Sequence, residues 1–558
     1  MLPRLALPPS HAVLAVLALA FVAPGLVGHD PWRAFDVIAI EIAHQMRLSG
    51  DWVVPRLAGE PWLDDPPFYH WVAAAFGTAF GWLLGFHNAA RLASGAAMLA
   101  ALWFLYLAAR HTALAALPAG DRDPAAEVPA RRGTGAAAML LLMGSVGLIV
   151  HAHEAVPDLA ALAAGCAALF FLVVSDRRTV RAGAAFGASL GVAFLSTGFV
   201  VPAVLGGAAL AAHLVCDAWR SPRALRFLGA AAAAFAIVAV AWPLALLWRS
   251  PELAAAWWQS ATSARGGFSG NLRYYLTTAT WFAWPAWPLA AWAAWTLRRE
   301  WRTPRVFVPL VAALAAPLAI AWAGPQQDIN AMVMLAPLAL LGAHGVPHLR
   351  RGAANALDWF GVMTFSVFAA LVWLGYVAMT TGAPARIAKN FTRPAPGFEA
   401  QFALLPFLVA VTLALAWLYL AFSAPRAPTR GVTRWAAGVT LLWGSFATLW
   451  LPWADHLKSY RSVALQLRSS LPANPGCIAA KELAPPQRAA LSYHAGIRTQ
   501  PLFLGAPTGA AVPGCRFLIV QGHPREEIVP GPGWQKLADV GRPGDKGERY
   551  RLYRYGPG

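Results

Sequence analysis

Charged residues are scarce in this sequence, and acidic residues are the scarcest among them. Only 13% of the 558 residues are charged, with 26 Asp and Glu against 44 Lys and Arg, whereas soluble globular domains carry about 25% charged residues. No glycine pattern of the Walker or Rossmann type is present. The composition therefore excludes an ordinary soluble globular protein, and the glycine pattern gives no sign of a nucleotide site.

Long apolar runs fill most of the chain. The hydrophobic content is 58% and the mean hydropathy is +0.50, and runs of about 17–25 apolar residues are long enough to cross a bilayer core of about 30 Å. The sequence predicts an all-α polytopic membrane protein with about thirteen spans and a small α/β domain at its carboxyl end. The predicted spans are 11–28, 90–109, 134–151, 156–174, 182–198, 199–215, 226–247, 275–297, 305–323, 329–347, 358–379, 401–422 and 435–453.

The excess positive charge follows the predicted topology. The formal net charge of +18 lies largely in short loops between spans, where Lys and Arg set membrane orientation, so it does not indicate nucleic-acid binding; the remaining cations can attract anionic membrane lipids. If 70–87 is a juxtamembrane or re-entrant helix, most arginines collect on one side, the predicted cytoplasm. The first loop 28–89, the loop 151–158 and the segment 456–558 then share the opposite side.

The first outer loop concentrates the acidic residues of a chain that has few. A helix is predicted over 35–46, lying on the membrane and ended by Gly50, with Asp36 in its first turn and Asp158 opening a later helix after Pro157. Both acids fit helix capping, yet both face one compartment and could converge on a pocket. The loop's acidic residues are Asp30, Asp36, Glu41, Asp51, Glu60, Asp64 and Asp65.

Histidines and cations near these acids leave two further interpretations open. His151, His153, Glu154 and Asp158 are residue types that bind zinc or manganese, although their spacing is equally that of a solvated membrane-surface loop. Outward cations are available for a phosphate or for anionic headgroups; they include Arg249, Arg265, Arg273, Arg386 and Lys389.

A sequence motif in the first loop resembles a known family. Gly50-Asp-Trp-Val-Val-Pro55, followed by Pro66-Pro-Phe-Tyr-His-Trp71, is similar to the first outer loop of GT-C membrane glycosyltransferases of the protein mannosyltransferase and aminoarabinose transferase type. The resemblance implies a multi-span fold with juxtamembrane helices, an acid in the second outer loop at Asp158 and a periplasmic domain at the carboxyl end. It also implies a polyprenyl-phosphate sugar as donor.

Two positions depart from the family pattern. The family's catalytic aspartate aligns with Phe35, and Asp36 takes the place of the neighbouring glutamate; the lysine thought to hold the lipid phosphate aligns with Asp65. A divalent cation would rationalise the second change, because carboxylates bind phosphate only through a cation. The resemblance therefore implies Asp36 and Asp158 as catalytic residues and Asp36, Asp65 and His153 as metal ligands. Its implied substrate-binding residues are Asp30, Glu41, Arg56, Asp64, Asp65, Tyr69, Arg265 and Arg273.

The expected function is transfer of a sugar from a polyprenyl-phosphate carrier to a lipid, glycan or protein acceptor at the periplasmic face of a bacterial inner membrane. Asp36, with Asp158, would act as general base. The alternative is a degenerate member that binds polyprenyl lipid or serves as an envelope scaffold without catalysis. A transporter ranks lower, because few charges fall inside the predicted spans.

The segment 456–558 is predicted to be a separate soluble domain after the membrane domain 1–455. Strands are expected at 517–521 and 550–554, a helix at 485–495, and a loop-rich region at 524–547. If this domain lies outside the cytoplasm, Cys477 and Cys515 can form a disulfide.

Overall fold

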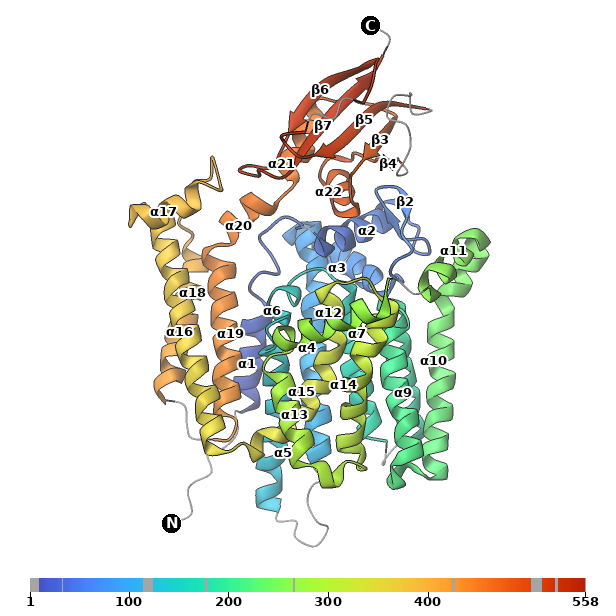
Figure 1. Cartoon of the computed structure of the whole chain (residues 1–558), viewed down its shortest axis with the longest axis vertical. Coiled ribbons are helices and arrows are strands. Elements are labelled where there is room, and N and C mark those ends of the chain that lie inside the picture. Colours follow the sequence, from blue (N-terminus) through green and yellow to red (C-terminus); the bar gives the residue numbers. More distant parts are fainter. Residues whose placement is uncertain are drawn as a thin grey trace.

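The computed structural model describes residues 10–32, 34–113, 124–175, 179–263, 266–423, 427–502, 514–526 and 530–556. It shows a bundle of long helices with a small sheet above one end (Figure 1). The helices of the bundle are α1 (His11–Val22), α4 (Phe86–Thr112), α5 (Pro124–Met143), α7 (Pro157–Val173), α8 (Thr179–Thr197), α9 (Val200–Val215), α10 (Pro222–Arg249), α12 (Phe268–Phe282), α13 (Ala286–Thr296), α14 (Pro304–Ala323), α15 (Leu335–Gly345), α16 (Arg351–Thr381), α18 (Leu404–Ser423) and α19 (Arg430–Leu449).

Short elements connect the bundle helices. Those at the end near the sheet are α2 (Phe35–Ser49), the strand pair β1 (Arg56–Leu57) and β2 (Glu60–Pro61), α3 (Phe68–Leu84), α6 (Leu148–His151), α11 (Pro251–Thr262), the 3-10 helix η4 (Asp328–Met334), α17 (Ala385–Thr392) and α20 (Leu451–Lys458). The 3-10 helices η2 (Asp217–Trp219), η3 (Arg298–Glu300) and η5 (Val346–His348) connect further bundle helices.

Many of the bundle helices have the properties of membrane spans. Within the described residues, seven helical segments are long and apolar enough to cross a bilayer, and α1, α7 and α9 are shorter apolar helices. A polytopic membrane protein is therefore supported, whereas the predicted number of thirteen crossings stays a prediction. The predicted span 275–297 is divided by a break at residues 283–285 into α12 and α13, and 329–347 begins with the 3-10 helix η4.

Glycines allow two of these helices to pack closely. Gly183 and Gly187 on α8 face the backbone of α10 at Phe227 and Ala231, and a Cβ atom at either glycine would overlap the facing carbonyl oxygen. Small residues four apart on one helix let two backbones approach in this way in membrane proteins. A side chain at either position would force α8 and α10 apart.

The C-terminal domain is a five-stranded mixed sheet with two helices. Its strand order is β4-β3-β5-β7-β6; β3 is parallel to β4 and β5, and β7 is antiparallel to β5 and β6. Cys477 at the start of β3 and Cys515 at the start of β5 are joined by a disulfide, as the sequence predicts. The elements are α21 (Arg461–Ser469), β3 (Cys477–Lys481), α22 (Pro485–Ala495), β4 (Gln500–Pro501), β5 (Cys515–Gly522), β6 (Trp534–Val540) and β7 (Arg549–Tyr555).

One predicted loop region contains a strand. The segment 524–547 was expected to be rich in loops, and β6 occupies its centre. β6 is an edge strand that pairs only with β7 and exposes most of its middle residues, so it lacks the apolar alternation that marks a strand in sequence. The turns at 530–533 and 541–547 are the part of this prediction that fits.

Helix α2 is buried between the bundle and the C-terminal domain. Val37, Ile42 and Met46 share a core with α21, α22 and the sheet, while Ile40 and Ala43 share another with α3 and α4. The apolar stripes that were expected to face the membrane therefore face protein, and the position of the helix relative to a membrane stays a prediction. It carries two apolar stripes, and each faces a different protein partner. Its carboxyl end is as predicted, because Gly50 ends it in the left-handed conformation at φ 69°.

Candidate functional site

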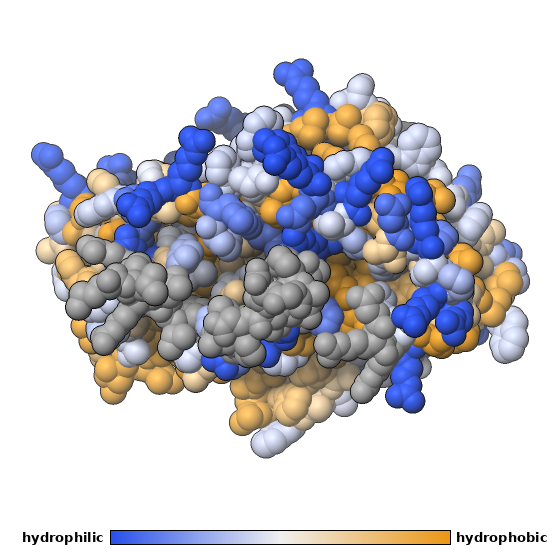
Figure 2. All heavy atoms as spheres, turned by 90° about the horizontal axis from the view of Figure 1, so that it is seen from below, coloured by the Kyte–Doolittle hydropathy of each residue, from blue (hydrophilic) through white to orange (hydrophobic). Residues whose placement is uncertain are grey.

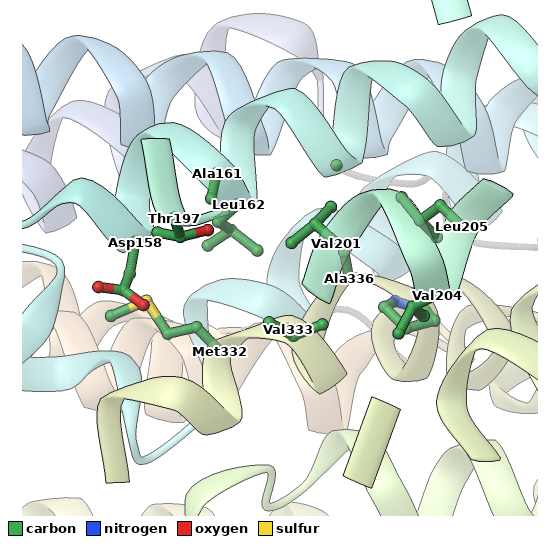
Figure 3. A pocket seen from close by; sticks show the side chains of 12 residues that line it. Asp158, Ala161, Leu162, Thr197, Val201, Val204, Leu205, Met332, Val333 and Ala336 are labelled. Carbon is green, nitrogen blue, oxygen red and sulfur yellow. The ribbon is translucent and has the colours of Figure 1, made fainter. Parts of the chain in front are cut away.

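An apolar groove opens between α7, α9 and α15 at the end of the bundle that carries the C-terminal domain. Its cavity volume is small, about 20 Å³. Asp158 and Thr197 lie at one end and Val204 and Leu205 at the other (Figure 3). The lining is otherwise aliphatic; it comprises Asp158, Ala161, Leu162, Gly165, Thr197, Val201, Val204, Leu205, Met332, Val333, Ala336 and Pro337. The aliphatic lining matches a hydrocarbon chain in its chemistry, and the polar end of the groove is at Asp158.

A polar cluster of the second outer loop lies beside this end of the groove. Nδ1 of His151 donates to Oε2 of Glu154 at 2.9 Å, and its Nε2 lies 3.8 Å from Oδ2 of Asp328 at the start of η4. Burial disfavours the charged imidazole, but the two carboxylates outweigh it and raise the pKa of His151 to about 9. Asp158 lies within electrostatic range of the same imidazole. A cation and three carboxylates therefore gather at the polar end of the groove.

A second hydrogen-bond network holds η4 against α12. Asn330 donates to the hydroxyl of Tyr275 at 3.0 Å, and this hydroxyl donates to the carbonyl of Pro325. Asn271 donates to the carbonyls of Ala321 and Gly324. These bonds fix the segment that carries Asp328 and so fix the partner of His151.

Asp36 is fully buried and belongs to an ion pair. Its carboxylate receives Nη2 of Arg91 at 2.8 Å and Nε at 3.0 Å, and both side chains are 0% exposed. The backbone N–H groups of Trp32 and Ala155 donate to the two oxygens at 3.1 and 2.7 Å. Burial raises the pKa of Asp36, but Arg91 and these donors outweigh burial and lower it overall. A carboxylate enclosed in this way has no surface that touches a substrate in this conformation, so the geometry does not favour Asp36 as the general base.

The Asp36 pair instead supports the second outer loop. Oδ1 of Asp36 accepts from the N–H of Ala155, and the hydroxyl of Ser94 donates to the carbonyl of Glu154. Tyr69, a predicted substrate-binding residue, is 1% exposed, and its hydroxyl lies 2.7 Å from that of Ser94. These contacts fix the loop that carries His151 and Asp158.

Phe35, unlike its neighbour Asp36, faces the polar cluster around His151. Its ring centre lies 6.4 Å from that of His151, edge to face. Successive residues of a helix point about 100° apart, so neighbouring positions at the start of α2 serve different surroundings. The position at which the resembled family carries its catalytic aspartate thus does face the cluster, and here it presents an aromatic ring.

Two predicted binding residues lie at contacts with the C-terminal domain. Oδ2 of Asp30 accepts from the hydroxyl of Ser459 at 2.6 Å. Glu41 is 0% exposed and accepts from the hydroxyl of Ser492 on α22 at 2.6 Å. Burial raises the pKa of Glu41 to about 7 despite its hydrogen bonds with Ser492 and Gln45. Both carboxylates therefore join the two parts of the chain, away from the groove lining.

The remaining predicted binding residues are dispersed. Arg56 is partly buried in β1 and donates to the carbonyl of Gly59 at 3.3 Å. Arg273 is exposed on α12, and Asp64 is exposed and Asp65 half-buried before α3. Arg265 lies outside the described residues. None of the four described residues among these lines the groove.

The predicted metal site of Asp36, Asp65 and His153 is not formed. Both ring nitrogens of His153 lie within 2.8 Å of the backbone carbonyl oxygens of Ile149 and Phe21, and Asp36 is held by Arg91. Over the part of the chain that the structure describes, no three His, Cys, Asp or Glu side chains are arranged to hold a metal ion. Asp36 and His153 are thus each occupied by other partners, and these described residues do not come together as the predicted ligand set.

Comparison with known proteins identifies the fold. No protein-family model and no curated protein matches the sequence. Two solved structures of ArnT from Cupriavidus metallidurans match over nearly the whole length. The form bound to undecaprenyl phosphate has 19% identity and a TM-score of 0.66, covering 97% of this chain and 96% of that one. The apo form has 18% identity and a TM-score of 0.67, covering 98% of each chain. The chain has the ArnT fold. The predicted likeness to GT-C glycosyltransferases is thereby confirmed for the fold.

Within this ArnT-like fold, the sequence did not point to several residues of the cluster. Asp328 and Tyr275 come from segments far from the second outer loop in sequence, and no motif marks them. Arg91 carried a signal, because it is a lone charge near the start of an apolar run, and such residues usually pair. Its partner could have been sought among the acids of the first loop.

Proposed function

We propose that the protein transfers a sugar from a polyprenyl-phosphate carrier to an acceptor at the membrane face that carries the C-terminal domain. The observation that carries the proposal is the apolar groove between α7, α9 and α15, which ends at Asp158 beside the His151 cluster. The aliphatic lining matches a polyprenyl chain in its chemistry, and the phosphate and sugar would lie at the polar end. The likeness to an ArnT structure bound to undecaprenyl phosphate supports this choice of donor.

In this proposal Asp158 takes the role of general base. The acceptor hydroxyl or amine attacks the anomeric carbon, the bond from that carbon to the phosphate oxygen breaks, and the acceptor proton passes to the Asp158 carboxylate. A positioned base of this kind contributes about 10²–10⁴-fold to the rate. Asp36 acts indirectly, by holding Ala155 and with it the second outer loop.

The proposed orientation places the C-terminal domain in the periplasm of a bacterial inner membrane. Many arginines gather near the helix ends opposite that domain, and Figure 2 shows hydrophilic side chains across the face seen from below. Positive charge of this kind marks the cytoplasmic side. The arginines are Arg110, Arg131, Arg132, Arg181, Arg220, Arg223, Arg226, Arg298, Arg299, Arg302, Arg305, Arg350, Arg351, Arg430 and Arg434.

A second candidate function is binding of the polyprenyl donor without catalysis. Phe35 favours it, because an aromatic ring faces His151 at the position where the resembled family has its catalytic aspartate. The two functions share the groove and differ only in turnover.

The test is incubation of the purified full-length protein with radiolabelled polyprenyl-phosphate sugars. Consumption of the donor is measured with and without EDTA for the wild type, Asp158→Asn and the control Asp217→Asn, which changes an exposed acid of η2. We expect the wild type and the control to consume donor and Asp158→Asn to lose at least 10²-fold in rate. Donor that is bound but never consumed would favour the binding protein, and full activity of Asp158→Asn would reject Asp158 as the base.

A further inference from the structure

The C-terminal domain has a shallow pocket with strongly basic lining, far in sequence from the groove. The pocket lies beside the end of β5, the loop between β6 and β7, and the start of β7. Its lining residues are His523, Pro524, Arg525, Asp545, Lys546 and Arg549.

Strand pairing brings these residues together. β5 and β7 are antiparallel, and their register places Gly522, the last residue of β5, opposite Arg549, the first residue of β7. Arg525 lies three residues after the end of β5, and Lys546 lies in the loop that leads into β7. Two loops and one strand end therefore converge on one point, and each contributes a cation.

The acidic residue in the lining offsets only part of this positive charge. Among the described residues that line the pocket, Asp545 is the carboxylate, and it forms an ion pair with Arg542. The guanidinium of Arg542 also lies 4.6 Å from the ring centre of Tyr460. Arg542 also lies 3.7 Å from Glu548, so the two carboxylates share its charge. Arg525, Lys546 and Arg549 line the pocket beside this group, and cations still outnumber carboxylates there. Arg525 and Lys546 are exposed.

The pocket adjoins the membrane-embedded part of the protein. Its β6–β7 loop touches the segment after α17, because a Cβ atom at Gly544 would overlap the carbonyl oxygen of Pro394. Arg542 of the same loop donates to the carbonyl of Leu457 at 3.2 Å. The loop therefore fixes the pocket beside the outer end of the bundle, near α17 and α20.

Helix α17 has the features of an element at a membrane surface. Phe391 packs edge to face on Trp450 and Trp453, with ring centres 4.9 and 5.2 Å apart, and tryptophan is enriched at the level of lipid headgroups. The exposed side of α17 and the residue that follows it carry further cations. These are Arg386, Lys389 and Arg393.

We propose that the basic pocket binds the phosphate group of an anionic membrane lipid. Three cations from converging loops match a phosphate, which accepts hydrogen bonds from several donors at once. The contact with the α17 segment places the pocket at the height of headgroups, where cations attract anionic lipid. Free phosphate has the same chemistry but would gain nothing from that position.

The experiment compares three probes on the detergent-solubilised full-length protein by thermophoresis. The probes are dihexanoyl phosphatidylglycerol, zwitterionic dihexanoyl phosphatidylcholine and inorganic phosphate. The variants are Arg525→Ala/Lys546→Ala, which changes two exposed side chains, and the control Arg516→Ala, an exposed arginine near the opposite end of β5. Thermal unfolding of each variant is measured alongside.

We expect the wild type and Arg516→Ala to bind the anionic lipid at least tenfold more tightly than either other probe. The double variant should lose about tenfold or more while unfolding at the wild-type temperature. Equal affinity of wild type and double variant would overturn the site. An equal loss in Arg516→Ala would show unspecific charge attraction, and inorganic phosphate binding as tightly as the lipid would overturn the assignment to a membrane lipid.

Discussion

Replacing Arg91 by methionine should destabilise the whole outer end of the bundle. The guanidinium of Arg91 pairs with Asp36 and also donates to the carbonyl oxygens of His29 and Asp30 at 3.0 and 2.9 Å. Arg91→Met keeps the length of the side chain but leaves the buried Asp36 carboxylate without its cation. Removing one partner of a buried ion pair costs about 3–5 kcal/mol.

The double variant Asp36→Asn/Arg91→Met separates the charge from the packing. An asparagine oxygen can still accept from the N–H of Ala155, and no uncompensated charge remains. We therefore expect the double variant to be more stable than Arg91→Met alone, with a coupling of about 1–3 kcal/mol. Because the pKa of Asp36 is lowered in the folded protein, its charged form stabilises the fold above the carboxyl's unfolded pKa of about 3.9. The stability of these variants should therefore be compared at neutral pH, where Asp36 is charged.

The assay is the half-life of monodisperse protein at elevated temperature in detergent, since unfolding of a large membrane protein is commonly irreversible. If a third of a 4 kcal/mol cost appears in the unfolding rate, the half-life falls about tenfold. Arg110→Met, in the last turn of the same helix, is the matched control. Wild-type half-life for Arg91→Met, or a double variant no more stable than the single one, would refute the reasoning.

Three further predictions concern stability. The pKa of His151 is raised to about 9, so the stabilisation by its charged form is fully present below about pH 6.5 and is lost as the pH rises toward 9. The melting temperature of the wild type should therefore fall over that pH range, and that of His151→Gln should change less with pH. The pKa of Glu41 is raised to about 7, so the fold favours its neutral form, and Glu41→Gln should raise the melting temperature at pH 8 and leave it unchanged at pH 4. Cys477→Ser/Cys515→Ser opens a loop of sequence separation 38 and should cost about 4 kcal/mol, seen as faster proteolysis of the C-terminal domain; resistance equal to wild type would argue against a stabilising disulfide.

Periodicity and motifs were enough to predict the fold but not the surroundings of each side chain. The helix beginning at Phe35, its end at Gly50 and the helix 485–495 appear in the structure with nearly the predicted bounds. These features depend on local chemistry: glycine in the left-handed conformation, proline at a helix start and runs of apolar residues. The motif from Gly50 to Trp71 made it possible to predict the GT-C fold.

The candidate site depends on direction and on distant segments, which a single sequence does not give. Asp36 and Phe35 are adjacent, yet one faces Arg91 and the other faces His151, because a helix turns by about 100° per residue. A carboxylate at position 36 therefore lies in a buried ion pair, whereas the side chain at position 35 faces the polar cluster. Asp328 meets His151 across nearly two hundred residues of chain, and the packing of η4 on α7, α12 and α14 fixes that meeting.

The shared core around α2 constrains the order in which the protein can be assembled. Val37, Ile42 and Met46 emerge from the ribosome early, but their partners on α21, α22 and the sheet are synthesised last. During the interval, the apolar stripe of α2 that will face these partners has no permanent cover and is open to aggregation or to a chaperone. The loop that leads to Asp158 thus contacts a helix whose own packing partners are complete only at the end of translation.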